Sequence, residues 1–385
     1  MGAQKKSLTR LLLVLAVVLV LAVVYIFHVR QDMTDFGVCY RAGQRVIQGE
    51  TLYRKADEHL QFKYSPASAL FFAPFSILPY EAAKPLWYIL LCVTAAAAFV
   101  LSRRLLRLEP KKAASLVLLT FLILLKFLGR EIELGQANLL IIFALTLMLF
   151  FYLQGKKTQA GLFWGFSLFF KPYALIFAPY FAVKKSFKTL VAGSSLLLAG
   201  LALPSLFYGL KGNILVLKEW PASLSQSTTG LLSVYDNASL SAFLLKIFSS
   251  PRENFGWLIF GLAAALLAVG FYWIVKRGKG QFSSTRPDIL ECSLLFILIP
   301  YLSPLGWYYN YLYSLLAILL LLSSFSKFPR LLQILLVINF AAISTSVVEV
   351  WGRGLFDFYT RHSLVVVNYL VVLLALAYLR MRRLA

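Results

Sequence analysis

The sequence has 385 residues, of which 60% are hydrophobic and 14% charged, and its formal net charge is +22. This composition excludes an ordinary soluble globular protein, in which about a quarter of the residues are charged. Long apolar segments recur along most of the chain. Because helices satisfy their backbone hydrogen bonds within lipid, the sequence predicts an all-α polytopic membrane protein with one integral membrane domain, residues 1–385.

In chain order, about twelve segments are apolar enough to be predicted as membrane-associated helices. The first follows Lys5, Lys6 and Arg10 and lacks a small-residue cleavage site, so we expect an uncleaved helix rather than a signal peptide. Lys171-Pro172 divides another segment into a hairpin that we do not expect to cross fully. The predicted segments are 9–27, 83–102, 113–128, 137–153, 159–170, 172–183, 189–207, 255–275, 289–301, 308–324, 331–347 and 363–379.

The basic residues predict the orientation of these helices. With the N-terminus in the cytoplasm, 22 of the 38 Lys and Arg residues but only three of the 16 acidic residues fall on the cytoplasmic side. This asymmetry is typical of a multi-pass protein of the cell membrane with both termini inside, and it explains the positive charge without nucleic-acid binding. The orientation requires that 66–78 does not cross. The stretch ASALFFAPFSIL has 12 residues and a proline, so we expect an interfacial or re-entrant helix.

Polar and aromatic residues gather at five junctions that this orientation places outside the cell. They lie in the predicted extracytoplasmic loop 28–82, in 126–138, at the hairpin apex, in the predicted loop 208–254 and in SPLGWYYN from Ser303. Any one cluster has an ordinary interpretation as solvated loop, aromatic belt or snorkelling lysine. Their joint placement predicts one polar cavity that opens outward.

The three Cys and three His show no metal-ligand spacing. The first loop carries no Asp-x-Asp motif, since two residues separate Asp32 from Asp35. We therefore expect no required cofactor; the sequence leaves a divalent metal open but does not indicate one.

The junction motifs resemble those of glycosyltransferase family 87, polyprenyl-phosphate-sugar-dependent membrane enzymes of the GT-C superfamily. The resemblance runs from about Asp35 to Tyr311 and is carried by the order of DFGVCYRAGQRVIQGETLY, FKYSPASALFFAPFSILP, GQANLL, FFKPYALIFAPY, DNASLSAFL and SPLGWYYNYL. It implies a GT-C-type helical bundle and a cell-envelope mannosyltransferase that inverts the configuration at the anomeric carbon of the transferred sugar. Its partners would be a polyprenyl-phosphate sugar, a lipid or glycan acceptor and membrane lipids.

The resemblance also implies roles for individual residues. The general base maps onto Asp35, the motif lysine onto Lys171, the amide pair onto Gln136 and Asn138, and the later Asn-x-Ser-Leu pattern onto Asn237, Ser239 and Leu240. Relatives often carry a His shortly after the Ser-Pro…Trp motif, whereas Trp307 here precedes Tyr308, Tyr309 and Asn310. Tyr309 or Asn310 is the expected replacement.

Inverting transfer from a lipid phosphate requires a carboxylate base and cationic donors to the leaving phosphate. Asp35 is the candidate base, and Asp32 is the alternative. A purely structural interpretation is that Asp35 caps the N-terminus of a helix. The candidate phosphate-binding residues are Lys171, Lys63, Arg41 and Arg45, and the candidate substrate-binding residues are Tyr64, Gln136, Asn138, Asn237, Trp307, Tyr309 and Asn310.

Two other classes of function stay open from the sequence. In a lipid or sugar transporter or flippase without glycosyl transfer, an intramembrane charge such as Lys126 would mark a substrate path. Such proteins often contain internal repeats, and we find none between 1–190 and 191–385. A non-catalytic membrane scaffold is the third class, and it leaves the composition of the Asp35 loop unexplained.

Overall fold

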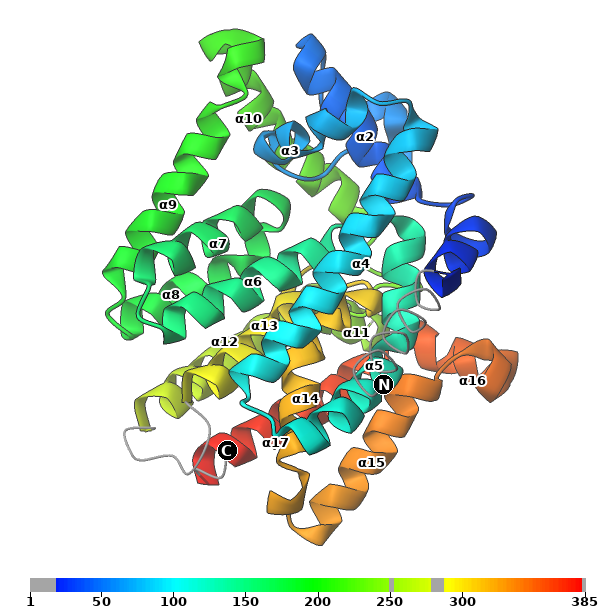
Figure 1. Cartoon of the computed structure of the whole chain (residues 1–385), viewed down its shortest axis with the longest axis vertical. Helices are drawn as coiled ribbons and strands as arrows, with labels where there is room; N and C mark the ends of the chain where they lie inside the picture. The colour runs from blue at the N-terminus through cyan, green and yellow to red at the C-terminus, as the bar shows by residue number, and fades with distance from the viewer. Residues whose placement is uncertain (1–18, 249–252, 278–286, 383–385) are drawn as a thin grey trace, which may run out of the picture.

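The computed structural model describes residues 19–248, 253–277 and 287–382 (Figure 1). Within these ranges the regular structure is helical, apart from one isolated bridge between Asn237 and Trp307. The elements are η1 (Tyr25–Val29), α2 (Thr34–Gln48), η2 (Lys55–Leu60), α3 (Pro66–Ser76), α4 (Tyr80–Leu105), α5 (Pro110–Leu134), α6 (Asn138–Leu153), α7 (Lys157–Phe170), η3 (Pro172–Ile176), α8 (Phe177–Val183), α9 (Phe187–Ala202), α10 (Ser205–Thr229), α11 (Leu240–Ile247), α12 (Glu253–Arg277), α13 (Pro287–Leu302), η4 (Tyr308–Ser314), α14 (Leu315–Ser323), η5 (Phe325–Lys327), α15 (Arg330–Thr345), α16 (Val348–Arg361) and α17 (Val365–Arg382).

The all-helical membrane fold is confirmed, but the count of about twelve spans is not. Four of the described helices, α4, α5, α12 and α17, are long and apolar enough to cross a membrane individually. Two bent pairs, α9 with α10 (96°) and α15 with α16 (99°), raise the number to six if each pair is one span. Other predicted segments form shorter helices. For example, the 14 residues of α7 extend about 21 Å, less than the roughly 30 Å of the hydrocarbon core.

Three boundaries differ from the sequence-based expectation. The predicted loop 28–82 contains the 15-residue helix α2, and the predicted loop 208–254 contains most of α10, all of α11 and the start of α12. Residues after 347 form α16, which was not predicted. The predicted N-terminal helix 9–27 lies partly outside the described residues; its described part belongs to an apolar helix, Leu19–Val29.

The hairpin break at Lys171-Pro172 is confirmed. Helix α7 ends at Phe170, Lys171 is extended (φ −134°, ψ 105°), and η3 starts at Pro172. A proline lacks the N–H that would continue a helix and pushes the residue before it toward extended conformations. The predicted short helix within 66–78 is present as α3, whose 11 residues are too few to cross a membrane.

Helices α7 and α9 approach closely through glycines. A Cβ on Gly165 would lie 2.6 Å from the carbonyl oxygen of Gly193, whereas a Cβ on Gly261 of α12 would meet no atom within 4 Å. Gly165→Ala is therefore expected to lower the stability of the folded protein by about 1–3 kcal/mol, because backbone on the opposite helix must shift. Gly261→Ala is the matched control and is expected to be neutral. Thermal melting of both variants in detergent checks this, and equal melting temperatures would contradict it.

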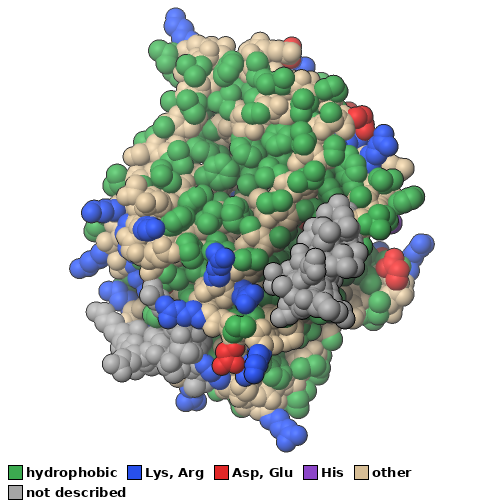
Figure 2. Space-filling view, viewed as in Figure 1, with side chains coloured by type: hydrophobic (Ala, Val, Ile, Leu, Met, Phe, Trp, Pro, Cys, Tyr) green, Lys and Arg blue, Asp and Glu red, His purple; other side chains and the backbone are tan. Residues whose placement is uncertain are grey.

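Polar side chains divide between the two ends of the helices. On the face shown in Figure 2, Lys and Arg gather mostly over the left and lower parts, while hydrophobic side chains cover a broad central area. Figure 1 places α2 and α3 at the opposite, upper end, next to the start of α4. Helix α5 has Lys111 and Lys112 in its first turn, at the end of the molecule rich in Lys and Arg, which we call the basic end. Its other end lies next to Gln136.

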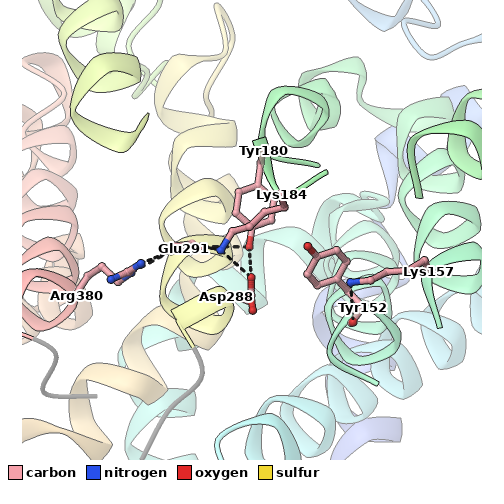
Figure 3. A network of polar contacts seen from close by, with 7 residues as sticks. All are labelled: Tyr152, Lys157, Tyr180, Lys184, Asp288, Glu291 and Arg380. Carbon is pink, nitrogen blue, oxygen red and sulfur yellow. Dashed lines mark hydrogen bonds and ion pairs between the residues drawn. The ribbon is translucent and has the colours of Figure 1, made fainter. Parts of the chain in front are cut away.

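A buried ionic network joins α8, α13 and α17 at the basic end (Figure 3). Glu291 is fully buried and pairs with Arg380 (2.6 Å) and Lys184 (2.6 Å). Lys184 also pairs with Asp288 (3.0 Å), and the Tyr180 hydroxyl donates to both carboxylates. Two cations thus balance two carboxylates at the start of α13, so the network ties the C-terminal helix α17 to the rest of the bundle.

Candidate active site

Asp35 is held at one end of the molecule by the amphipathic helix α2. The buried face of α2 includes Phe36, Cys39, Tyr40 and Val46, and the helix is followed by its C-cap Gly49, whose φ of 67° suits a glycine. Asp35 lies in the first turn, where the helix dipole favours an acid. The N-cap is Met33, so the N-cap interpretation of Asp35 does not hold.

Gln136 is brought to Asp35 by the turn between α5 and α6. Gly135, the C-cap that follows α5, has a φ of 69°, a left-handed conformation that glycine adopts without steric strain, and Gln136 comes next. The Gln136 amide donates hydrogen bonds to Asp35 Oδ2 and to the hydroxyl of Tyr309 (3.3 Å), and its oxygen accepts from the Tyr64 hydroxyl (3.1 Å). One amide therefore fixes a carboxylate between two tyrosines that are far apart in sequence.

Asp35 faces a cavity of about 350 Å³. Seven of the predicted site residues line it: Asp35, Lys63, Tyr64, Gln136, Lys171, Trp307 and Tyr309. Sequence reasoning did not assign the remaining wall, which is largely apolar and aromatic: Val38, Cys39, His59, Gln61, Phe62, Phe170, Pro172, Tyr173, Leu224, Leu231 and Leu305. The cavity thus combines a carboxylate and two ammonium groups with an extensive apolar lining.

The charges in this cavity influence one another. Burial raises the pKa of Asp35, and the Gln136 hydrogen bond together with the charges of Lys63, Arg130 and Lys171 opposes this rise. Burial lowers the pKa of Lys63, and the negative charge of Asp35 opposes this decrease. The arrangement suits a carboxylate that must accept a proton beside cations able to hold an anion.

A chain of buried, hydrogen-bonded polar side chains lies behind the cavity wall. It includes Glu131, which the sequence analysis did not propose as a site residue. Lys171 Nζ donates to Asn310 Oδ1 (3.3 Å), and the Asn138 amide donates to Asn310 Oδ1 (3.1 Å) and to Glu131 (2.7 Å). Glu131 also accepts the backbone N–H groups of Asn138 and Leu139, and so caps the start of α6. Asn138 and Asn310 therefore support Lys171 rather than line the cavity. The available signal is the position of Glu131 at the polar end of α5, next to Arg130 and close to Glu133.

Besides Asn138 and Asn310, three more predicted residues, Arg41, Arg45 and Asn237, do not line the cavity. Arg45 forms a bidentate ion pair with Asp57, and Arg41 is exposed. Asn237 is fully buried; its amide donates to the carbonyls of Leu231, Leu232 and Pro304 and its oxygen accepts from Ser239 and Gly306, so its hydrogen-bonding groups are used in fixing the chain. Asp32, the alternative base, is exposed and outside the lining. The described residues include no group of three or more His, Cys, Asp or Glu placed to hold a metal ion.

Comparison with known proteins places the chain within a family. Neither the search of curated proteins nor that of solved structures found a match. The model of glycosyltransferase family 87 matches residues 62–299, more than half of the chain. The matched segment contains Lys63, Tyr64, Gln136 and Lys171, while Asp35 precedes it and Tyr309 follows it. The chain belongs to glycosyltransferase family 87 and is therefore a membrane-embedded glycosyltransferase.

Proposed function

We propose that the protein is an inverting GT-C-type transferase that moves a hexose, mannose by the resemblance, from a polyprenyl-phosphate sugar to a lipid or glycan acceptor. The observation that carries this proposal is the cavity in which Asp35 faces two lysines among apolar and aromatic side chains. A lipid-linked sugar needs both a polar pocket for its phosphate and an apolar surface for its prenyl chain.

Asp35 is the proposed general base. Gln136 occupies Oδ2, and among the described residues no side-chain donor bonds Oδ1, which leaves that oxygen for the acceptor hydroxyl. As Asp35 takes the hydroxyl proton, the acceptor oxygen bonds to the anomeric carbon and the bond from that carbon to the phosphate oxygen breaks. The electron pair leaves with the phosphate, and the configuration inverts.

Lys171 and Lys63 are the proposed ligands of the departing phosphate. Both line the cavity, and both lower the pKa of Asp35, so their charges reach the reacting region. Asn310 positions the Lys171 ammonium from behind. Donors placed where negative charge develops stabilise the transition state more than the substrate.

We place the cavity on the extracytoplasmic side of the cell membrane and both termini in the cytoplasm. The support is the polarity of the helices: α5 starts at a basic end and finishes at the cavity, and α13 has the ionic network at its start and the cavity residue Leu305 just beyond its end. Basic residues favour the cytoplasmic side.

The test is transfer by the purified full chain from a synthetic short-chain polyprenyl-phosphate mannose labelled in the sugar. We expect a labelled product with inverted anomeric configuration and one polyprenyl phosphate released per transfer. The same assay with polyprenyl-phosphate glucose tests the sugar, and a nucleotide-activated mannose tests the donor class. Turnover with the nucleotide sugar and none with the lipid-linked sugar would reject the proposal.

Lys171→Met is expected to lower kcat about 100-fold, because a charged donor to the leaving phosphate is lost. Lys188→Met, an exposed lysine on α9 at the basic end, is the matched control and is expected to leave kcat unchanged. Steady-state kinetics on both variants checks this. An equal kcat for Lys171→Met and the unmodified protein would remove Lys171 from the mechanism.

A further inference from the structure

A second cavity of about 200 Å³ lies beside the first and is not used by the proposed reaction. It is lined by several residues, among them Lys126, Phe127, Asp236, Tyr308, Ser346, Glu349 and Tyr359. Tyr308 lines this cavity and its neighbour Tyr309 lines the first, with their ring centroids 5.6 Å apart. Two adjacent tyrosines thus form part of the wall between the cavities.

Lys126 brings a positive charge into this second cavity from within the membrane-crossing helix α5. Its ammonium donates to the carbonyl (3.1 Å) and to the hydroxyl of Ser346, at the bend between α15 and α16, and lies 4.9 Å from the centre of the Phe127 ring. Among the described residues, no carboxylate lies within 4.0 Å of this ammonium. A charge in a membrane segment is unfavourable unless an opposite charge or polar groups compensate it.

The two carboxylates of the cavity do not supply that compensation. Asp236 is half-buried; burial raises its pKa, the charges of Arg130 and Lys246 oppose this rise, and its carboxylate lies more than 4.0 Å from the Lys126 ammonium. Glu349 is exposed. The charge of Lys126 is therefore the one that an anionic ligand would balance.

The surroundings of Lys126 indicate that this ligand is a lipid. Lys126 lies eight residues before the end of α5 at Leu134, about 12 Å along the helix axis. Leu122 lies one turn away on the same face and is 48% exposed, and Phe358 of α16, next to Tyr359 of the lining, is 54% exposed. A ligand that enters between α5 and α16 therefore passes exposed apolar side chains.

We propose that the cavity at Lys126 binds the phosphate group of an anionic phospholipid, whose acyl chains lie against the exposed apolar residues of α5 and α16. The ammonium has three N–H donors, and its hydrogen bonds within the described residues go to a single residue, Ser346. This site is separate from the proposed donor cavity, and its assignment does not depend on which sugar the enzyme transfers.

The test is native mass spectrometry of the full chain in detergent with phosphatidylglycerol and phosphatidylcholine of the same acyl chains. The unmodified protein is expected to retain phosphatidylglycerol preferentially. Lys126→Met is expected to weaken this binding about tenfold or more, whereas Lys126→Arg retains it. Lys112→Met, an exposed lysine at the other end of α5, is the control and leaves it unchanged. Equal retention of both lipids by the unmodified protein, or full retention by Lys126→Met, would overturn the proposal.

Two further measurements distinguish a lipid site at Lys126 from a simple ion site and from lipid bound elsewhere on the protein. Inorganic phosphate added in excess is not expected to displace the lipid, and displacement would identify an ion site instead of a lipid site. A photoactivatable phosphatidylglycerol is expected to cross-link the unmodified protein to peptides of α5 or α16. Cross-links confined to other helices would contradict the assignment even if Lys126→Met failed to fold.

Discussion

Asp35→Asn is expected to reduce glycosyl transfer by about 10²–10⁴-fold while the protein stays folded. The variant keeps the size of the side chain and can still bond Gln136, but it has no carboxylate to take the acceptor proton. Initial rates with labelled polyprenyl-phosphate mannose measure the loss of transfer. The melting temperature and the size-exclusion profile show whether the variant stays folded. Asp32→Asn is the matched control, because Asp32 is exposed and lies outside the cavity lining. Equal rates for Asp35→Asn and the unmodified protein would exclude Asp35 as the base.

The pH profile of the unmodified enzyme gives an independent test of the same role. A base must be deprotonated to act, so the rate falls as the pH drops through the pKa of Asp35. Burial raises that pKa, and the acidic limb of kcat/KM is therefore expected above the ordinary carboxyl range. A rate that stays constant down through the ordinary carboxyl range would show that another group accepts the proton.

Glu291→Gln is expected to lower the free energy of unfolding by about 3–5 kcal/mol, the range for removing one partner of a buried ion pair. The substitution removes a fully buried carboxylate that pairs with the buried Arg380 and with Lys184, whose side chain is 22% exposed. Thermal melting in detergent is the measurement, and transfer activity measured well below the melting temperature should persist because the network lies at the far end of α13 from the cavity.

The control for this stability change is an exposed pair. Glu109 and Lys112 lie 3.8 Å apart with both side chains more than 70% exposed. Exposed pairs contribute roughly 0–1 kcal/mol, so Glu109→Gln is expected to change the melting temperature little. If Glu291→Gln and Glu109→Gln melted at the same temperature, the buried network would not be a main tie between α13 and α17.

Apolar segments predict where most helices lie, because burial in lipid or in the bundle requires runs of hydrophobic residues. The same signal does not report the polar helices α2 and α16, which expose charged residues, or α10 beyond residue 208, where Lys211, Asn213 and Lys218 interrupt the apolar pattern. The apolar pattern also does not show that several predicted helices are too short to cross the membrane. The length of each helix in the bundle depends on where the chain bends and breaks.

For the site, local motifs predict the residues that face the cavity better than those that support it. Gln136 and Lys171 lie at a helix end and a helix break that Gly135 and Pro172 mark in the sequence, and Asp35 lies in the first turn of α2. The pairing of Arg45 with Asp57 and the capping of α6 by Glu131 are tertiary contacts without such a marker. Leu224 of α10 and Leu231, just beyond its end, reach the cavity after the 96° bend between α9 and α10, and no local pattern shows this.

The two bent helix pairs also determine the shape of the surrounding bilayer. Helices α9 and α15 have 16 residues each, about 24 Å, and both present exposed apolar side chains, such as Leu198 (69%) and Ile338 (61%). Each then turns by more than 90° instead of continuing. Because the hydrocarbon layer is about 30 Å thick, the resulting hydrophobic mismatch is expected to thin the membrane on both flanks. Lipid headgroups would then sink toward the level of α10 and α16, and a substrate anchored in the leaflet would reach its cavity with little vertical displacement.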